Sequence, residues 1–175
     1  PKGHCTTSAL FSIWDGCFKH IDEGESLVFV LLDFSKAFDT LDHSLMLCAK
    51  LAFYGFDHVS RSIVQSYLLN RFQALTINDG ISNIGKITSG VPRGSILGPL
   101  LFLIYTAELL NAPRNCKIHG FADDTQLYQH FDHLNVNTAC QLINEDLDII
   151  ASQSEQMGIK LNVKKCSAIC LSTRK

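Results

Sequence analysis

The sequence predicts an α+β fold in which an antiparallel sheet carries helices packed on one face. Short runs of large and β-branched apolar residues alternate along the chain with longer stretches whose apolar residues recur at helical spacing. The chain has 175 residues, of which 46% are hydrophobic and 18% charged, so it can bury one sizeable core. No repeat or low-complexity linker divides the sequence, and we expect a single domain over residues 1–175.

The first predicted elements are a helix and a buried strand. The helix should start near Thr6 and Thr7, whose hydroxyls can cap it, and end at Gly24. A wholly apolar run, 27–32, then predicts a strand buried on both faces of the sheet, and this strand ends at Asp33. The apolar residues of the helix are expected in the core: Leu10, Ile13, Trp14, Cys17, Phe18 and Ile21.

Two helices and a hairpin are predicted next. Residues 43–53 and 57–69 have helical spacing and are separated by a break around Gly55. Asn78-Asp79-Gly80 is typical of a tight hairpin turn. The strands that it joins are 72–77 and 81–88. The remaining elements are a helix at 95–110, hairpin strands at 117–121 and 125–128, a longer helix at 135–156, and strands at 159–163 and 167–171.

Three carboxylates predict a site for two divalent cations. Asp33 ends the buried strand, while Asp123 and Asp124 occupy the turn of the second hairpin. Carboxylates held close together repel and need cations, and oxygen ligands favour Mg²⁺ or Mn²⁺. An Asp-Asp pair is also ordinary turn chemistry, because Asp bonds its own backbone there. The Gly-rich segment 89–99 and the order of these features favour the metal site.

Four segments, in this order, resemble the palm motifs of reverse transcriptases, in the form carried by non-LTR retrotransposons and group II introns. They are Leu31–His43, Ser89–Phe102, Phe121–Asp124 and Gly158–Cys166. A fifth, Gly3–Leu10, is similar to the segment that enters the fingers in these elements. The resemblance covers nearly the whole chain.

The resemblance implies a polymerase palm with part of the fingers, in the right-hand reverse transcriptase fold. Residues 1–26 would form the helix that leads into the fingers, and residues 27–175 the palm with a portion of the fingers. The thumb, the primer grip, the upstream fingers strands and any endonuclease domain are expected to lie outside this sequence. The sequence would then be a fragment of a longer polyprotein.

The implied activity is RNA-directed DNA synthesis, a two-metal transfer of dNTPs onto the 3′-hydroxyl of a DNA primer paired with an RNA template. By resemblance, Asp33 and Asp123 hold two Mg²⁺ or Mn²⁺ ions. The backbone carbonyl of Phe34 would help to hold the nucleotide-side ion, and Asp124 would support the primer-side ion. The implied catalytic residues are therefore Asp33, Asp123 and Asp124.

The resemblance also implies a dNTP pocket. Phe38 matches the steric gate whose ring excludes a 2′-hydroxyl, and Gly94 suits close approach of the backbone to a nucleotide or template base. Arg93 stands where the family usually carries Gln, whose amide both donates and accepts hydrogen bonds. Lys165 matches a Lys that protonates or neutralises pyrophosphate. The implied pocket residues are Ser35, Lys36, Ala37, Phe38, Arg93, Gly94 and Lys165.

Structural roles are expected for the other polar residues singled out. Asp39 lies in the turn of the first motif, Asp42 can cap a helix, and His43 stands near the start of that helix. His130 and His133 lack a third metal ligand at suitable spacing, so we expect them in a surface loop.

Charge, cysteine content and hydropathy bear on the partners and the cellular location expected for the protein. A net charge of -2 lacks the Lys and Arg surplus of nucleic-acid binders, a deficit that missing fingers and thumb would explain. The seven cysteines have no CxxC spacing and are expected to be reduced thiols. No apolar run reaches the ~20 residues of a membrane helix, and no signal peptide is evident. We expect no membrane contact and an intracellular location, in cytoplasm or nucleus.

Two other functions remain open. One is an inactive or domesticated remnant that keeps the fold with a nucleic-acid-binding or assembly role. Arg93 and Cys5 favour it, whereas the intact acidic residues oppose it. The other is a different palm-fold enzyme, such as a cyclase or an RNA polymerase, because the fold alone does not fix the substrate. Phe38 and the order of the motifs oppose this second alternative.

Overall fold

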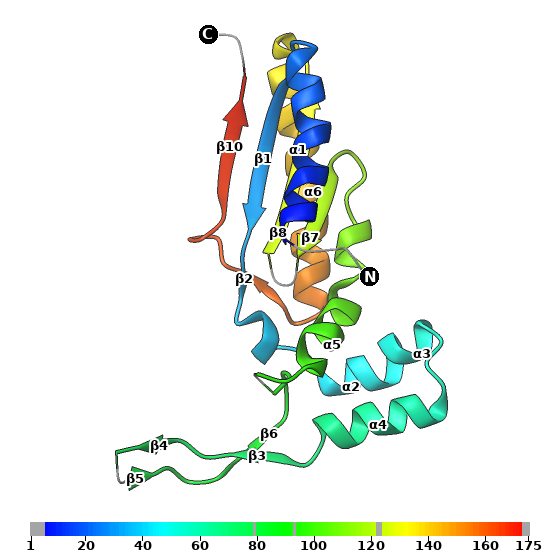
Figure 1. Cartoon of the computed structure of the whole chain (residues 1–175), viewed down its shortest axis with the longest axis vertical. Coiled ribbons are helices and arrows are strands. Elements are labelled where there is room, and N and C mark those ends of the chain that lie inside the picture. Colours follow the sequence, from blue (N-terminus) through cyan, green and yellow to red (C-terminus); the bar gives the residue numbers. More distant parts are fainter. Residues whose placement is uncertain (1–5, 79, 93, 122–123, 173–175) are drawn as a thin grey trace. The chain divides into compact units, whose positions relative to one another are not determined.

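The computed structural model describes residues 6–78, 80–92, 94–121 and 124–172 (Figure 1). They fold as two compact units. The first is built from the described parts of Pro1–Ser35, Glu108–Gln156 and Lys160–Lys175, and the second from those of Lys36–Ala107 and Met157–Ile159. A membrane span would need a longer or more apolar helix than any found in the described ranges.

The first unit is organised around an antiparallel sheet with the strand order β10-β1-β8-β7. β1 (Ser26–Leu32) lies between β10 (Ser167–Leu171) and β8 (Asp124–Phe131), and β7 (Lys117–Phe121) completes the hairpin with β8. The hairpin and the final strand occur where the sequence predicts them. An apolar strand such as β1 fits this inner position, because strands pair with both of its edges and helices cover both of its faces.

Helices cover both faces of this sheet. α6 (Val136–Gln156) packs on the face that carries Val30 and Leu32 of β1. α1 (Thr6–Asp22) packs on the face that carries Leu27. The expectation of helices on one face holds for α6, whereas α1 covers the other face, because side chains alternate along a strand and β1 is apolar on both sides.

Only one stripe of α1 reaches the sheet. Ile13 and Cys17 are buried, whereas Trp14 and Phe18 are 53% and 54% exposed. The two exposed rings pack edge to face with their centroids 5.8 Å apart. The core prediction is therefore confirmed for Ile13 and Cys17 and wrong for Trp14 and Phe18, because a helix packed on one side buries a stripe only about 100° wide.

Two helices of the second unit, α2 and α4, begin at aspartate caps. Asp42 caps α2 (His43–Leu45), where its carboxylate accepts a hydrogen bond from the Leu45 N–H at 2.7 Å. Asp57 caps α4 (His58–Leu68) in the same way. The cap predicted at Asp42 is confirmed, and α4 starts within one residue of its predicted position.

The helix predicted at 43–53 contains an irregular turn. After α2 the backbone forms a π-helical turn over Met46–Lys50 and returns to α-helix in α3 (Leu51–Phe53). Gly55, with φ at +76°, then reverses the chain, as expected for a glycine that ends a helix.

α5 (Leu97–Thr106) is shorter than its predicted span of 95–110. Several of its side chains are buried, including those of Phe102 and Tyr105. Tyr105 is fully buried, and its hydroxyl donates to the Met157 carbonyl at 2.6 Å. The same hydroxyl accepts a hydrogen bond from the Asp42 N–H at 3.3 Å. Tyr105 therefore ties together three segments of the unit that are distant in sequence.

The hairpin predicted around residue 79 forms two short ladders instead of one. β3 (Arg71–Gln73) pairs with β6 (Gly85–Ile87), and β4 (Thr76–Ile77) pairs with β5 (Gly80–Ile81). The Ser82 N–H donates to the Leu75 carbonyl between them. The apolar side chains of this hairpin are largely exposed.

Asp146 of α6 organises the loop that leads into β7, a role that sequence analysis missed. Its fully buried carboxylate accepts backbone hydrogen bonds from Arg114, Asn115 and Cys116 at 2.7 to 2.9 Å. Burial alone raises the pKa of Asp146, but these donors outweigh burial and hold its pKa below the ordinary value. Burial, with a contribution from Asp146, raises the pKa of the Cys116 thiol to about 12.

We predict that Asp146→Ala lowers the free energy of unfolding by about 3 kcal/mol at pH 7, because three N–H groups lose a charged acceptor. The contribution of a carboxylate with a lowered pKa is present above its unfolded pKa of about 3.9 and is lost as pH falls through the folded pKa. The deficit of the variant should therefore shrink below pH 4. Urea unfolding at pH 7 and at pH 3 measures the loss of unfolding free energy in the variant at each pH. An equal loss at the two pH values would contradict the prediction. Asp148→Ala on the same helix is the control.

Candidate active site

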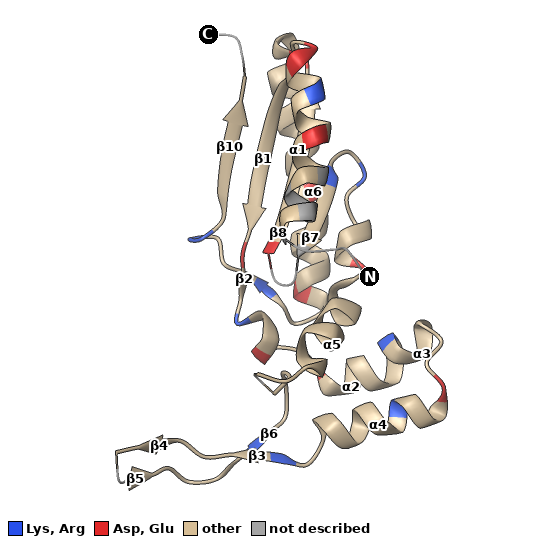
Figure 2. Ribbon diagram, in the orientation of Figure 1, with Lys and Arg blue, Asp and Glu red and all other residues tan. Residues whose placement is uncertain are grey.

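The first unit brings two of the predicted carboxylates to one end of the sheet. In the antiparallel β1–β8 pair, Leu32 lies opposite Thr125. Asp33 directly follows Leu32 and Asp124 directly precedes Thr125, so the end of β1 and the start of β8 both present an acidic residue (Figure 2). Asp33 is partly exposed and Asp124 is exposed. Asp123, the third predicted carboxylate, lies outside the described residues.

The fourth motif packs against Asp33. The Asn162 N–H donates to the Asp33 carbonyl at 2.8 Å, and the Asp33 N–H donates to the Cys166 sulfur at 3.5 Å. Nζ of Lys165 lies 3.8 Å from Oδ2 of Asp33. The Lys165 side chain is 68% exposed, so solvent weakens this ion pair and the ammonium can turn toward another anion. The structure thus places Lys165 beside Asp33, while its role toward pyrophosphate stays a prediction.

Phe34 and Ser35 form β2, a two-residue strand that pairs with β9 (Lys160–Leu161). The Phe34 side chain is buried and Ser35 is partly exposed. The donors that the sequence assigns to the metals are carboxylates and a backbone carbonyl, which is an all-oxygen set. Such a set suits a hard cation such as Mg²⁺ or Mn²⁺, and the accessible carboxylates of Asp33 and Asp124 fit that requirement.

The second unit holds the rest of the first motif in a tight turn. Lys36 is exposed and adopts φ +51°, and Ala37–Asp39 forms a single 3₁₀ turn. The partly exposed Phe38 ring packs on Phe102 of α5, with centroids 4.7 Å apart and planes at 40°. Phe38 is therefore held in place by an aromatic contact. Arg93 lies outside the described residues.

Gly90 lies against the backbone of the turn that contains Phe38 and Asp39. Its N–H donates to the Leu41 carbonyl at 2.7 Å, and the neighbouring Val91 N–H donates to the Phe38 carbonyl at 2.8 Å. A Cβ on Gly90 would lie 2.8 Å from both the Phe38 oxygen and the Asp39 Cα, and its φ is +80°. The backbones of the first and second motifs therefore touch at a position that only glycine fits.

Two side chains strengthen this contact. Nε2 of the buried His43 is 2.7 Å from the Gly90 carbonyl, and the Ser89 hydroxyl donates to the Asp39 carbonyl at 3.1 Å. The structural roles expected for Asp39 and His43 are thus confirmed. Sequence analysis assigned no role to Gly90. Its position in Ser89-Gly90-Val91-Pro92, two residues before a proline, was a usable signal.

Gly94 differs from Gly90. It also has a positive φ, +73°, but a Cβ there would meet no described atom within 4 Å. Packing within the protein therefore does not require a glycine at this position. Its predicted approach to a nucleotide or template base stays a prediction.

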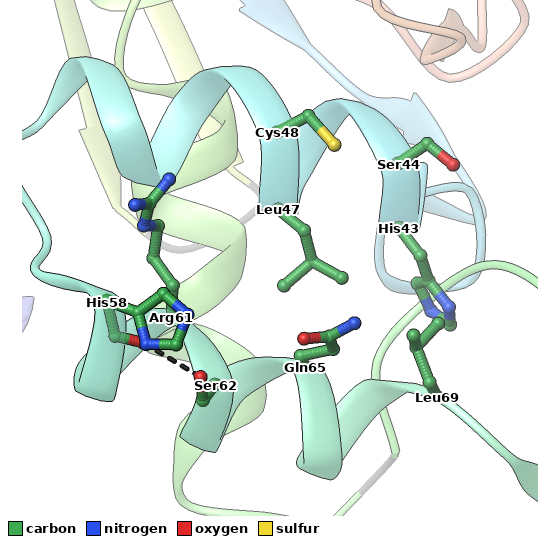
Figure 3. A pocket seen from close by; sticks show the side chains of 9 residues that line it. All are labelled: His43, Ser44, Leu47, Cys48, His58, Arg61, Ser62, Gln65 and Leu69. Atoms are coloured by element: carbon green, nitrogen blue, oxygen red, sulfur yellow. Dashed lines mark hydrogen bonds between the residues drawn. The ribbon is translucent and has the colours of Figure 1, made fainter.

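Described residues of the second unit line cavities, two of which border the motifs or helices named above. The first, of about 650 Å³, borders the turn of the first motif and is lined by Lys36, Asp39, Thr40, Gln73, Lys86, Ile87, Thr88, Ser89, Gly90, Val91 and Pro92. The second cavity, of about 380 Å³, has two walls (Figure 3). One wall is the helical segment that begins at α2, and the other is α4. Its labelled side chains include His43, Arg61 and Leu47. The first cavity carries two lysines beside a partly exposed Asp39, a mixture suited to phosphate groups with a cation.

Comparisons with known proteins give one consistent result. The sequence model of a family described as "Reverse transcriptase (RNA-dependent DNA polymerase)" matches residues 3–174. The chain is 24% identical over 180 residues to "Probable RNA-directed DNA polymerase from transposon BS" of Drosophila melanogaster. It is 26% identical over 179 residues to "RNA-directed DNA polymerase from mobile element jockey" of the same species. It is also 29% identical over 163 residues to "Retrovirus-related Pol polyprotein from type-1 retrotransposable element R2" of Popillia japonica.

These relatives are much longer than the chain. The matches cover 99%, 98% and 86% of the chain, but only 19%, 19% and 25% of the three relatives. Among solved structures, apo telomerase from Candida tropicalis truncated from its C-terminal domain matches 98% of the chain and 36% of its own length. The TM-score is 0.69 at 10% identity. Telomerase from Candida albicans in complex with a fragment of telomeric RNA matches with a TM-score of 0.68 at 14% identity, over 98% of the chain and 32% of its own length. Such low identities establish a shared fold and nothing more.

We predict that Gly90→Ala destabilises the chain by about 2 kcal/mol more than Gly55→Ala. Both residues have a positive φ, so both variants carry the strain of that backbone conformation, about 1 kcal/mol. Only at Gly90 does the new methyl meet backbone atoms at 2.8 Å, whereas nothing lies within 4 Å at Gly55. Chemical denaturation of both variants measures the difference, and equal losses would show that the close approach costs nothing.

Proposed function

The chain belongs to the reverse transcriptase family, as its four motifs predicted, and we propose that it carries the polymerase centre of an RNA-directed DNA polymerase. The proposed reaction adds a dNTP to the 3′-hydroxyl of a DNA primer paired with an RNA template. The observation that carries the proposal is the β1–β8 register, which sets Asp33 and Asp124 at the same end of neighbouring strands. Because the template is RNA, we place the reaction in the cytoplasm or the nucleus.

Asp33, Asp123 and Asp124 are the proposed ligands of two Mg²⁺ or Mn²⁺ ions, with help from the Phe34 carbonyl. When bound, such ions activate the primer hydroxyl and neutralise the departing pyrophosphate. The backbone of Asp33 is fixed by its hydrogen bonds with Asn162 and Cys166, so its carboxylate points from a rigid strand end. Rigid placement of Asp33 supports the proposal, since metal-dependent transfer depends on ligand position.

Lys165 is the proposed acid for the leaving pyrophosphate. Its ammonium is close enough to Asp33 to stay at this end of the sheet and exposed enough to reach a phosphate. Proton donation or simple charge neutralisation by Lys165 would both stabilise the pyrophosphate as the bond to the α-phosphate breaks.

Phe38 is the proposed gate against ribonucleotides, and Ser35, Lys36, Ala37, Arg93 and Gly94 are proposed to line the nucleotide pocket. Support for the gate comes from its rigidity. The Phe38 ring packs on Phe102, and its carbonyl is held by the Val91 N–H. A ring held by this packing would exclude a 2′-hydroxyl by contact alone.

We predict that Asp33→Asn lowers primer extension by roughly 100-fold or more, because a neutral amide is a poor ligand for Mg²⁺. The test places residues 1–175 in a complete fingers, palm and thumb polymerase and measures dNTP addition on an RNA template with Mg²⁺ or Mn²⁺. Asp123→Asn should lose activity in the same way.

Asp132→Asn is the matched control for that measurement. Asp132 is an exposed acid at the other end of β8 whose side chain caps a 3₁₀ turn, and asparagine caps equally well. It should keep full activity. A folded graft that extends no primer before any substitution would refute the polymerase proposal and favour the remnant with a binding or assembly role.

We predict that Phe38→Val lowers the preference for dNTPs over rNTPs by roughly 10-fold or more, the scale of one lost steric contact. Phe38→Tyr keeps the ring and should keep the preference. Single-nucleotide addition with dNTP and rNTP gives the ratio of kcat/KM values. An unchanged ratio in Phe38→Val would mean that another residue excludes the 2′-hydroxyl.

A further inference from the structure

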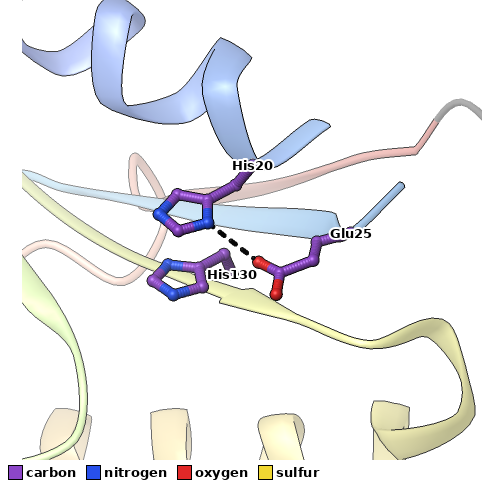
Figure 4. Close-up of side chains that lie close together, drawn as sticks. All are labelled: His20, Glu25 and His130. Atoms are coloured by element: carbon purple, nitrogen blue, oxygen red, sulfur yellow. Dashed lines mark ion pairs between the residues drawn. The ribbon is translucent and has the colours of Figure 1, made fainter. Parts of the chain in front are cut away.

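Three side chains with metal-binding atoms meet at the opposite end of the sheet from Asp33 (Figure 4). His20 lies in the last turn of α1, Glu25 directly precedes β1, and His130 lies near the end of β8. The β1–β8 register pairs His130 with Leu27, two residues after Glu25. Packing of α1 on this face of the sheet then brings His20 over the same point.

His130 does not lie in a surface loop, as the sequence suggested, because β8 extends to Phe131. His133 lies beyond the strand and pairs with Asp132 at 2.9 Å. The other two ligands, His20 and Glu25, come from segments more than 100 residues away from His130 along the chain. Sequence spacing could not reveal a site assembled by packing a helix on a sheet.

The three side chains lie close enough together to reach one ion. The His20 and His130 rings stack with centroids 3.7 Å apart and planes at 9°. Nδ1 of His20 is 3.0 Å from Oε2 of Glu25. One nitrogen or oxygen from each residue lies within 4.8 Å of the other two. Ligand atoms around a tetrahedral zinc stand about 3.4 Å apart at bond lengths near 2.1 Å. Because stacked rings direct their nitrogen lone pairs into parallel planes, one imidazole must rotate out of the stack for both rings to bind the same ion.

Two atoms of this cluster lack hydrogen bonds. Nδ1 of His20 and Oε2 of Glu25 are shielded from water, and among the described residues neither has a hydrogen-bond partner, despite their 3.0 Å separation. Shielded polar atoms without hydrogen bonds are costly unless something else satisfies them. A cation between the imidazole and the carboxylate would satisfy both.

We propose that His20, Glu25 and His130 form a site for Zn²⁺ or a similar late divalent cation. Two imidazoles and one carboxylate make a mixed nitrogen and oxygen donor set, which zinc accepts and Mg²⁺ disfavours. Oε2 of Glu23, 3.8 Å from Nδ1 of His20, or a water supplies the fourth position. The site is independent of the carboxylates at Asp33, from which it is separated by the length of β1, roughly 25 Å.

The charges of the cluster agree with this proposal. A neutral ring nitrogen is the form of histidine that binds metals. Burial lowers the pKa of His130, and the adjacent His20 lowers it further. A bound ion would link the end of α1 to β8, and so fasten the helix whose buried stripe on the sheet includes Ile13 and Cys17.

The test is a titration of the metal-free 175-residue chain with Zn²⁺ by calorimetry, and with Co²⁺ by visible absorption. We expect one ion per chain with the spectrum of nitrogen and oxygen ligands, and a rise in melting temperature with Zn²⁺. Glu25→Gln and His130→Gln should each weaken Zn²⁺ binding by more than roughly 100-fold. Loss of a residue that only hydrogen-bonds to a metal ligand costs roughly 10- to 100-fold, and loss of a ligand itself should cost more. Both variants keep a polar side chain of similar size, and circular dichroism without metal checks their fold.

His133→Gln is the matched control, because this histidine lies three residues beyond His130 and outside the cluster. It should bind Zn²⁺ as the unmodified chain does. Equal weakening in His130→Gln and His133→Gln would overturn the proposal. So would an intense thiolate-to-cobalt band in the near ultraviolet, which would assign the ion to cysteines. Absence of binding at millimolar Zn²⁺ would also overturn it.

Discussion

The antiparallel pairing of β1 with β8 is the constraint on which the first unit depends. Its register sets Leu32 opposite Thr125 at one end and Leu27 opposite His130 at the other. The first pair places Asp33 and Asp124 together, and the second places His130 beside the start of β1. A slip of one residue would turn every side chain of β1 to the wrong face, so the buried faces of the strand also fix the position of both sites.

β1 is packed against a helix on each of its two faces. Alternate residues of the strand pack against α6 on one side and α1 on the other. Because both faces are apolar, a slip would be opposed by the lost fit of individual side chains against the two helices and not by exposure of apolar surface. Polar residues lie at the ends of these strands, because the core does not cover the strands there. Acidic residues gather at one end, and histidines with Glu25 gather at the other.

The second unit uses backbone contacts where the first uses side-chain burial. The turn that carries Phe38 is fixed by hydrogen bonds from Gly90 and Val91, by His43, and by the Phe102 ring. Main-chain contact requires glycine at position 90, because any Cβ would meet the Phe38 carbonyl. The proposed gate is thus held by contacts with residues of a different motif.

The sequence by itself determined the order of the elements, most helix starts, the apolar strand and the membership of the family, because these depend on local spacing and on four motifs. It also predicted a site at Asp33, Asp124 and Lys165, which the structure places at one end of the sheet. Tertiary structure alone decided the second helical face, the exposed Trp14 and Phe18, the buried Asp146, the close approach at Gly90, and the His20, Glu25 and His130 cluster. Each of these depends on which distant segments pack together, and neither periodicity nor motif spacing contains that information.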